Sequence, residues 1–243
     1  MLLFNFLFYF CLFTIGACFG SFLTMASYRL VKGEDIVFKR SYCPKCNKTL
    51  KIRSLFPIFS WIFQKGRCLN CKSKISIRYP LIELITAIGF IITYQYVKNL
   101  NIYYQIFYYL LFLLCTLISI IDIETYEIPY TLQILFLIFG LIYTIFSKNY
   151  IINIPVGIGY FLFFYIISYI VSKYKKRDSL GGADLSLVLG IGFFLGINNI
   201  NLFLLLSGIL GILFSVIWKK FYKKEEFPFG PSLLLAMFIS MLL

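Results

Sequence analysis

The 243-residue chain is 60% hydrophobic and 20% aromatic, and only 14% of its residues are charged. Such a composition lies far from that of soluble globular domains and is typical of integral membrane proteins. The chain contains no histidine, which excludes the commonest general base and the commonest zinc-binding nitrogen. Any acid–base chemistry must therefore use carboxylates.

Residues 1–25 form an apolar run that is long enough to span a bilayer. The run lacks the basic start and the cleavage site of a removable signal peptide, so we expect a retained first helix that leaves the membrane at Arg29 and Lys32. The small residues between Gly16 and Gly20 favour close packing with a second helix, although a flexible apolar stretch fits nearly as well.

The only sizeable polar segment, residues 29–80, contains two CxxC pairs, Cys43 with Cys46 and Cys68 with Cys71. Each pair can present two sulfurs to one tetrahedral ion, so the pattern predicts a four-thiolate zinc site. Four thiolates leave no open coordination position, which indicates a structural zinc. Disulfides are the competing interpretation, but they require an oxidising compartment, and a redox CxxC would need only one pair.

After residue 80, apolar runs follow one another with short gaps. We expect helices over residues 81–97, 102–121, 130–146, 151–172, 185–197, 202–218 and 229–243. With the first helix, these predict an all-α polytopic bundle of about eight transmembrane helices with a small zinc-binding loop module. The expected parts of the chain are a first transmembrane helix at 1–28, the four-cysteine segment at 29–80 and a transmembrane bundle at 81–243.

The 23 Lys and Arg residues fall unevenly on the connections between these helices. If successive connections alternate sides, 21 basic residues lie on one side, and only Lys98 and Lys148 lie on the other. Basic residues gather on the cytoplasmic side of membrane proteins, so we expect the cysteine segment inside and both termini outside. A reducing cytoplasm favours zinc over disulfides. The basic face should attract anionic lipids, and without a recognisable reader fold no nucleic-acid partner is expected.

Two of the ten acidic residues lie at the expected cytoplasmic ends of different helices. Asp122 follows an apolar run that ends inside, and Asp184 precedes one that begins inside, after Gly181, Gly182 and Ala183. Alone, Asp184 fits a helix cap, but a charge beside a spanning helix also indicates function. Two carboxylates at one depth predict a pair that shares a proton, in which the ionised acid activates water and the protonated acid polarises a carbonyl. This chemistry is aspartic proteolysis at a membrane surface.

Several motifs resemble those of the type IV prepilin peptidases, members of the GxGD class of membrane aspartic proteases. Residues 122–129, from Asp122 to Pro129, look like the first catalytic motif of that family, and residues 181–184 resemble GxGD. The likeness covers nearly the whole chain and includes Gly20-Ser21-Phe22-Leu23, Tyr28-Arg29, the paired CxxC, Gly66-Arg67-Cys68, Arg78-Tyr79-Pro80-Leu81-Ile82-Glu83 and Pro228-Phe229-Gly230-Pro231.

The resemblance implies a bacterial inner-membrane endopeptidase that removes a short basic leader from prepilin or pseudopilin precursors, with Asp122 and Asp184 as the catalytic pair. Bifunctional members also transfer a methyl group from S-adenosylmethionine to the new N-terminal residue. The cysteine segment is found in the bifunctional form, and its four cysteines match the zinc ligands of the family. Glu83 matches a family acid near the site, with a role in either cleavage or methylation.

The sequence departs from the family pattern at three positions. Ala183 stands where the motif has Gly, which limits a positive φ, Ser186 stands where many members have Lys, and Tyr130 stands where many have Asp. The changes at Ser186 and Tyr130 bear on substrate preference. Glu124 and Glu127 lie in a turn without Lys or Arg and are candidates to attract a basic leader, although interfacial solvation explains them equally well. The competing hypothesis for the whole chain is a non-catalytic membrane scaffold or transporter with a structural zinc module.

Overall fold

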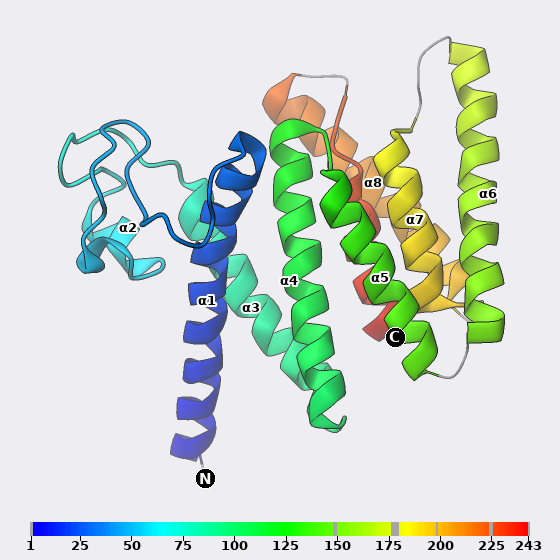
Figure 1. Cartoon of the computed structure of the whole chain (residues 1–243), viewed down its shortest axis with the longest axis horizontal. Coiled ribbons are helices and arrows are strands. Elements are labelled where there is room, and N and C mark those ends of the chain that lie inside the picture. Colours follow the sequence, from blue (N-terminus) through cyan, green and yellow to red (C-terminus); the bar gives the residue numbers. More distant parts are fainter. Residues whose placement is uncertain (1, 148–149, 176–179, 198, 224–225, 243) are drawn as a thin grey trace. The chain divides into compact units, whose positions relative to one another are not determined.

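The described part of the chain, residues 2–147, 150–175, 180–197, 199–223 and 226–242 of the computed structural model, is built from helices and two isolated β-bridges. The chain divides into two compact units, Met1–Leu117 and Ile118–Leu243 (Figure 1). In chain order the helices are α1 (Leu2–Lys32), the 3-10 turn η1 (Ile52–Ser54), α2 (Phe59–Phe63), α3 (Arg78–Val97), α4 (Ile102–Thr125), α5 (Tyr130–Phe146), α6 (Tyr150–Lys175), α7 (Gly182–Leu195), α8 (Ile200–Tyr222) and α9 (Gly230–Leu242).

Five of the described helices, α1, α3, α4, α6 and α8, are long and apolar enough to cross a membrane. The apolar helices α5, α7 and α9 are shorter. At about 1.5 Å per residue the 14-residue α7 measures roughly 21 Å, less than the ~30 Å hydrocarbon core of a bilayer. The chain is therefore a multi-pass, all-α membrane protein, and the prediction of about eight crossings is not settled by helix length.

Several helix ends differ from the sequence prediction. Helix α1 continues to Lys32, so the first basic residues belong to its last turns. Helix α3 begins at Arg78 instead of residue 81, because Pro80 is tolerated in a first turn, where a backbone N–H needs no helical partner. Helices α4 and α7 each include the acid that was expected just outside them, Asp122 and Asp184.

Within the first unit, α1 and α3 pack closely at two glycines. A β-carbon on Gly16 would lie 2.8 Å from the Cα of Ala87, and one on Gly20 would lie 2.7 Å from the Cα of Glu83. Any side chain at either position would push the two helices apart. The small-residue stretch is thus a helix-packing surface, as the sequence favoured.

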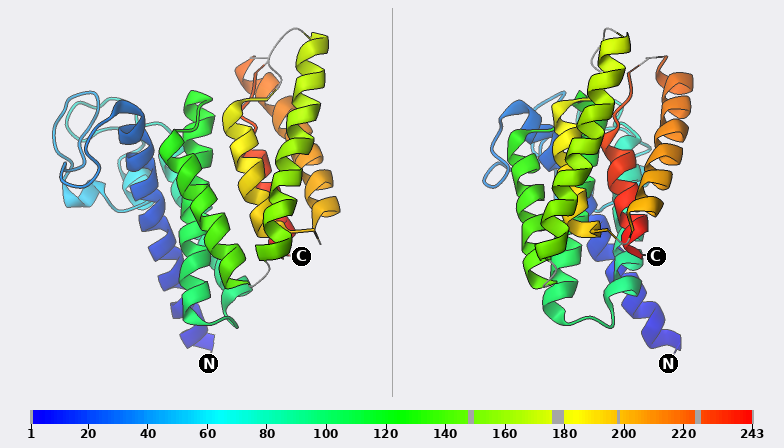
Figure 2. Two further views of the ribbon diagram at one scale, coloured as in Figure 1. Left: turned by 45° about the vertical axis from the view of Figure 1, so that its right-hand side comes forward. Right: turned by 90° about the vertical axis from the view of Figure 1, so that its right-hand side faces the viewer.

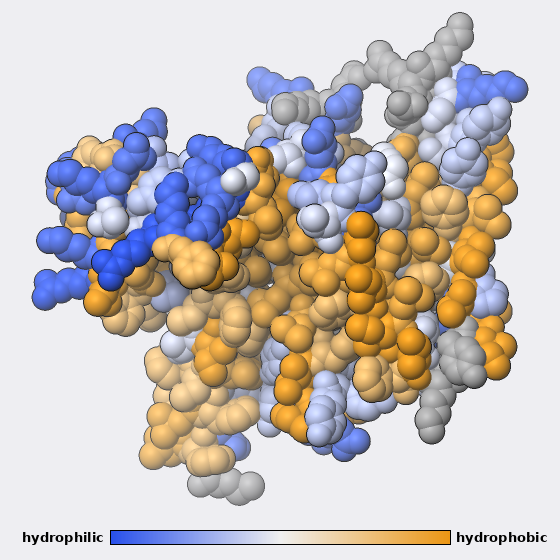
Figure 3. Space-filling view, viewed as in Figure 1, coloured by the Kyte–Doolittle hydropathy of each residue, from blue (hydrophilic) through white to orange (hydrophobic). Residues whose placement is uncertain are grey.

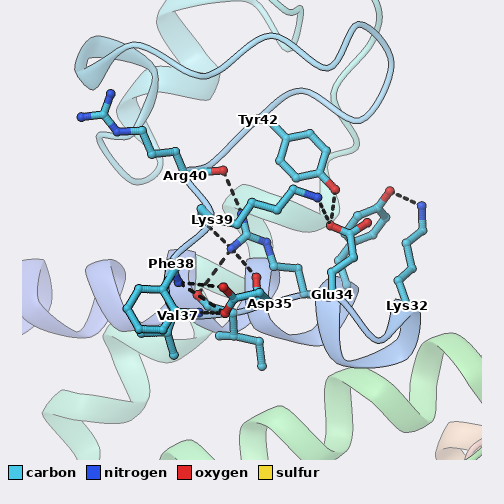
Figure 4. A network of polar contacts seen from close by, with 11 residues as sticks. Lys32, Glu34, Asp35, Val37, Phe38, Lys39, Arg40 and Tyr42 are labelled. Carbon is cyan, nitrogen blue, oxygen red and sulfur yellow. Dashed lines mark hydrogen bonds and ion pairs between the residues drawn. The ribbon is translucent and has the colours of Figure 1, made fainter.

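The loop that follows α1 is organised by a buried guanidinium group. Arg29 is 1% exposed, and its two terminal nitrogens donate hydrogen bonds to four backbone carbonyls. Figure 4 shows this network, in which Glu34 also pairs with Lys39 at 2.6 Å and accepts a hydrogen bond from the Tyr42 hydroxyl at 2.6 Å. The carbonyls that Arg29 binds are those of Asp35, Ile36, Lys39 and Arg40. Arg29 therefore ties the cysteine segment to the end of α1.

In the second unit, α7 lies between α5 and α6 and also contacts α9, which packs on α8 (Figures 1 and 2). Close approach depends on glycines, because a β-carbon on Gly192 would lie 2.5 Å from the Cα of Gly157 and one on Gly190 would lie 2.6 Å from the Phe136 ring. The packing buries most of α7 beyond its first turn. Beyond its first turn, α7 is therefore held by three neighbouring helices.

The surface changes character along the chain (Figure 3). Hydrophilic residues cover the cysteine segment, and hydrophobic residues cover the long helices. This distribution suits a polar module outside the bilayer and helices within it. Part of the predicted charge pattern, at Lys148, Lys176, Arg177 and Lys224, lies outside the described residues.

Candidate active site and metal centre

The two CxxC pairs fold into matching turns. The N–H of the first cysteine in each pair donates to the carbonyl five residues later, that of Lys48 at 3.0 Å and that of Ser73 at 2.9 Å. The residue four positions after each first cysteine, Asn47 or Lys72, has a positive φ and donates its N–H back to the cysteine carbonyl. The two turns therefore present their sulfurs with the same backbone geometry.

The four sulfurs of these turns form one cluster and lie within 4.8 Å of one another. A Zn–S bond of about 2.3 Å in a tetrahedral site requires roughly 3.8 Å between sulfurs, and the sulfurs of Cys43 and Cys71 are 3.9 Å apart. The hydrogen bond with the Ser73 hydroxyl lowers the pKa of the Cys71 thiol to about 6. Against the backbone hydrogen bond from Lys48, the neighbouring sulfurs of Cys71 and Cys43 raise the pKa of the Cys46 thiol to about 11. All seven cysteines are described and none forms a disulfide. The cluster can hold a metal ion and is compatible with zinc.

Asp122 lies in the last turn of α4 and is 5% exposed. Its Oδ2 accepts a hydrogen bond of 3.0 Å from the N–H of Gly230, the first residue of α9. Free N–H groups at the start of a helix stabilise a negative charge. A β-carbon on Gly230 would lie 2.7 Å from that oxygen, so the approach requires glycine.

Asp184 occupies the first turn of α7 and is half-buried. Its carboxylate turns back towards the N–H of Gly181, the capping residue of α7, and it interacts electrostatically with Asp122. Because Gly181 is the N-cap, Asp184 is not the helix cap that the sequence offered as one interpretation; it lies in the first turn, where the positive end of the helix also suits a carboxylate. Asp122 and Asp184, from separate helices of the second unit, lie close enough to interact electrostatically.

The small residues before Asp184 leave open space on one side of it. Gly181 and Gly182 are exposed, and a β-carbon on Gly182 would meet no atom within 4 Å. None of these residues needs a positive φ, because Gly182 and Ala183 already belong to α7. The expected conformational limit of Ala183 in place of Gly therefore does not arise.

Two side-chain contacts that the sequence did not indicate position the surroundings of the pair. The buried Gln133 of α5 donates to the Ile128 carbonyl at 2.6 Å and accepts a hydrogen bond from the Ser186 hydroxyl at 2.8 Å. It thus links the turn after α4 to the start of α7. The signal that could have found it is a lone amide inside the apolar run of α5.

The second contact involves Trp218 near the end of α8. Its indole N–H donates to the Tyr126 hydroxyl at 3.0 Å, and its ring stacks on that of Tyr222. Tyr126 has a φ of 60°, and its N–H donates to the carbonyl of Asp122. The end of α4 is therefore closed by a left-handed residue that α8 holds in place.

The remaining sequence candidates lie in different surroundings. Glu83 is a buried residue of α3 in the first unit, and its Oε2 accepts a hydrogen bond of 2.6 Å from the N–H of Ile58 in the cysteine segment. Glu124 is half-buried near the end of α4, and Glu127 is exposed in the turn that follows. Tyr130, the first residue of α5, is 81% exposed.

Residues 14–97 match the bacterial peptidase A24 N-terminal domain, and residues 109–216 match the type IV leader peptidase family. The first match contains the cysteine cluster and Glu83. The second contains Asp122 and Asp184.

Curated relatives extend the match over most of the chain. The prepilin leader peptidase/N-methyltransferase of Bacillus subtilis (strain 168) is 31% identical over 228 residues, which cover 91% of this chain and 89% of the relative. The type 4 prepilin-like proteins leader peptide-processing enzyme of Escherichia coli O78:H11 is 29% identical, and the match covers 83% of this chain and 75% of the relative. The prepilin leader peptidase/N-methyltransferase of Neisseria gonorrhoeae is 28% identical, and the match covers 93% of this chain and 87% of the relative. No solved structure matches the chain.

The chain therefore belongs to the type IV leader peptidase family.

Proposed function

We propose that this membrane enzyme removes the short basic leader of type IV prepilin-like precursors at the cytoplasmic membrane face and N-methylates the newly exposed residue. The relatives that match most of the chain carry both activities in their names. The observation that supports the proposal for cleavage is that the second unit brings Asp122 of α4 and Asp184 of α7 close enough to interact electrostatically. The hypothesis of a non-catalytic scaffold or transporter has no comparable support.

Cleavage uses the two carboxylates and one water molecule. Carboxyl groups in mutual contact keep one proton between them, so one is ionised and one is protonated. The ionised member takes a proton from water, which attacks the scissile carbonyl, while the protonated member donates a hydrogen bond to the carbonyl oxygen. The tetrahedral intermediate then collapses as the leaving amine takes up a proton.

The substrate backbone passes over the glycines at the start of α7. Gly181 and Gly182 are exposed and leave open space beside Asp184, which suits an extended main chain that must approach closely. Glu124 and Glu127 lie near the end of α4 and attract the basic leader before cleavage. The apolar part of the precursor stays in the bilayer.

The chain crosses the bacterial inner membrane eight times, with its termini outside and its cysteine segment in the cytoplasm. The excess of basic residues on the connections assigned to the cytoplasm supports this orientation. Because α7 is roughly 21 Å long, water can reach its first turn, where Asp184 lies. Residues 1–28, 29–80 and 81–243 serve as a first anchor, a zinc-binding module and the protease bundle.

Cys43, Cys46, Cys68 and Cys71 hold a structural zinc ion, since four sulfurs complete a tetrahedral site. Methylation uses S-adenosylmethionine as the donor. When bound, the donor would supply a methyl group to the amine nitrogen, its sulfur would leave as a neutral thioether, and the amine proton would pass to water.

The purified protein in detergent should cleave a prepilin peptide that contains the leader and the first residues of the apolar helix. Asp122→Asn and Asp184→Asn should each lower kcat by at least about 10²-fold, because each removes one member of the acid–base pair. Cleavage is measured by mass spectrometry of the products.

Asp35→Asn is the matched control, because Asp35 is an exposed loop residue of the first unit whose role as a backbone acceptor an amide can fill. It should cleave at the parent rate. Full activity of both Asp122→Asn and Asp184→Asn, in variants that insert and melt like the parent, would end the protease assignment.

A further inference from the structure

A cavity of about 340 Å³ lies within the first unit. Its walls come from α1, α3 and the cysteine segment, including the metal-binding residues Cys43 and Cys68. Its volume is within the range of about 300–1,000 Å³ that small-molecule sites occupy. The cleavage chemistry described above does not use this cavity.

The lining chemistry indicates which ligand the cavity takes. Among the described residues that line it, Glu83 is the only one with a carboxylate. Aromatic residues and hydroxyl groups line the cavity as well, and the aromatic residues are Tyr28, Tyr42, Trp61 and Tyr79. Aromatic rings beside a carboxylate favour a cationic ligand with a flat, apolar part.

The basic lining residues do not form a strong anion site. The buried Arg29 already binds the carbonyls of the neighbouring loop with both terminal nitrogens. Lys45 and Lys74 are exposed at the cavity and can meet a single carboxylate at its edge. A ligand with several phosphates would need more donors than remain.

We propose that this cavity is the methyl-donor site, that it takes the nucleoside sulfonium S-adenosylmethionine, and that Glu83 recognises the sulfonium charge. The proposal rests on the proposed N-methyltransferase activity and assigns Glu83 to methylation instead of cleavage. A donor that combines an adenine ring, a positive centre and an amino-acid carboxylate matches the aromatic residues, Glu83 and the lysines. The metal centre forms part of the wall and keeps the cavity in shape.

Glu83 also has a structural contact, and the test must separate the two roles. Its Oε2 accepts the Ile58 N–H, which fixes the cysteine segment on α3. In Glu83→Gln the amide oxygen can still accept that hydrogen bond, whereas the negative charge is lost. A purely structural Glu83 would therefore tolerate glutamine, and a charge-recognising Glu83 would not.

The experiment measures binding to the full-length protein in detergent by equilibrium dialysis, without any prepilin present. The two ligands are S-adenosylmethionine and S-adenosylhomocysteine, which lacks the sulfonium charge. The parent should bind the sulfonium more tightly than the neutral thioether. Glu83→Gln should weaken S-adenosylmethionine binding about tenfold, a loss of about 1.4 kcal/mol, and change S-adenosylhomocysteine binding less than twofold.

Lys45→Ala and Lys48→Ala form a matched pair, because both lysines are exposed in the same cysteine turn and only Lys45 lines the cavity. Lys45→Ala should weaken binding of both ligands several-fold, and Lys48→Ala should leave it unchanged. If Glu83→Gln weakens the binding of both ligands equally, Glu83 does not recognise the sulfonium charge. Absence of donor binding in a parent protein that cleaves prepilin would overturn the cavity assignment while leaving the peptidase in place.

Discussion

The approach of Gly230 to Asp122 leaves no room for a side chain. The Gly230 N–H donates to the carboxylate at 3.0 Å, and this contact joins residues 108 positions apart in the chain. Because the glycine opens α9, the contact also directs the positive end of a helix at the acid. One residue thus sets the position of one carboxylate of the proposed catalytic pair.

Gly230→Ala should therefore lower the cleavage rate about tenfold or more. A β-carbon would lie 2.7 Å from Asp122 Oδ2, so the carboxylate must move and lose a buried hydrogen bond worth about 1–3 kcal/mol. The measurement is kcat for the prepilin peptide. Gly208→Ala in α8 is the control, because a β-carbon there would meet nothing within 4 Å; equal rates in the two variants would show that the contact does not matter for catalysis.

Among the elements, the packing of α1 against α3 depends most clearly on glycines, which have no side chain to keep the two helices apart. Gly16 and Gly20 let α1 lie directly against the backbone of α3, and the contact at Gly20 is made with Glu83. Helices in a membrane gain stability from such close packing, since the bilayer supplies no hydrophobic force between them. The same contact places α1 and α3 as two walls of the cavity.

Gly20→Ala should lower the stability of the first unit by about 1–3 kcal/mol, the usual cost of an added group in a tightly packed interface. Thermal unfolding in detergent, followed by circular dichroism, should show a melting temperature several degrees lower. The matched variant is Gly159→Ala in α6, where a β-carbon would meet nothing within 4 Å. An unchanged melting temperature for Gly20→Ala would mean that α1 and α3 do not pack at this glycine in the membrane protein.

Across the whole molecule, the metal cluster and the acid pair fall in different compact units. The four cysteines lie in Met1–Leu117, while Asp122, Asp184 and the residues that position them lie in Ile118–Leu243. The first segment matched by a protein family, residues 14–97, lies within the first unit, and most of the second, residues 109–216, lies within the second unit. Perturbing one unit should therefore affect one activity more than the other.

Removal of the metal by a strong chelator under reducing conditions should weaken S-adenosylmethionine binding at least about tenfold, because metal binding contributes folding free energy to the module that forms a cavity wall. Cleavage of the prepilin peptide should fall much less. Zinc content is followed by elemental analysis, and Cys43→Ser with Cys46→Ser should reproduce the effect. If donor binding survives complete loss of metal, the metal cluster is not needed to form the donor-binding cavity.

Much of the architecture followed from local pattern. The apolar runs predicted every long helix, and the limits of α5 agree at both ends. The paired CxxC predicted a four-sulfur cluster because each pair forms its turn within six residues and needs no distant partner. The end of α4 and the start of α7 were predicted wrongly because an apolar run ends at a charged residue. The helical hydrogen bonds of the backbone continue through that residue.

The sequence alone thus determined the class of membrane protein and the four-cysteine cluster, since each depends on composition or on short spacing. It also predicted the two acids as a catalytic pair. Only the tertiary structure decided that Gly230 meets Asp122, that Gln133 joins the turn after α4 to α7, and that Glu83 lines a cavity with the cysteine segment. These contacts join residues from different helices. Such contacts depend on how the helices pack, and the periodicity of the sequence does not predict which helices contact one another.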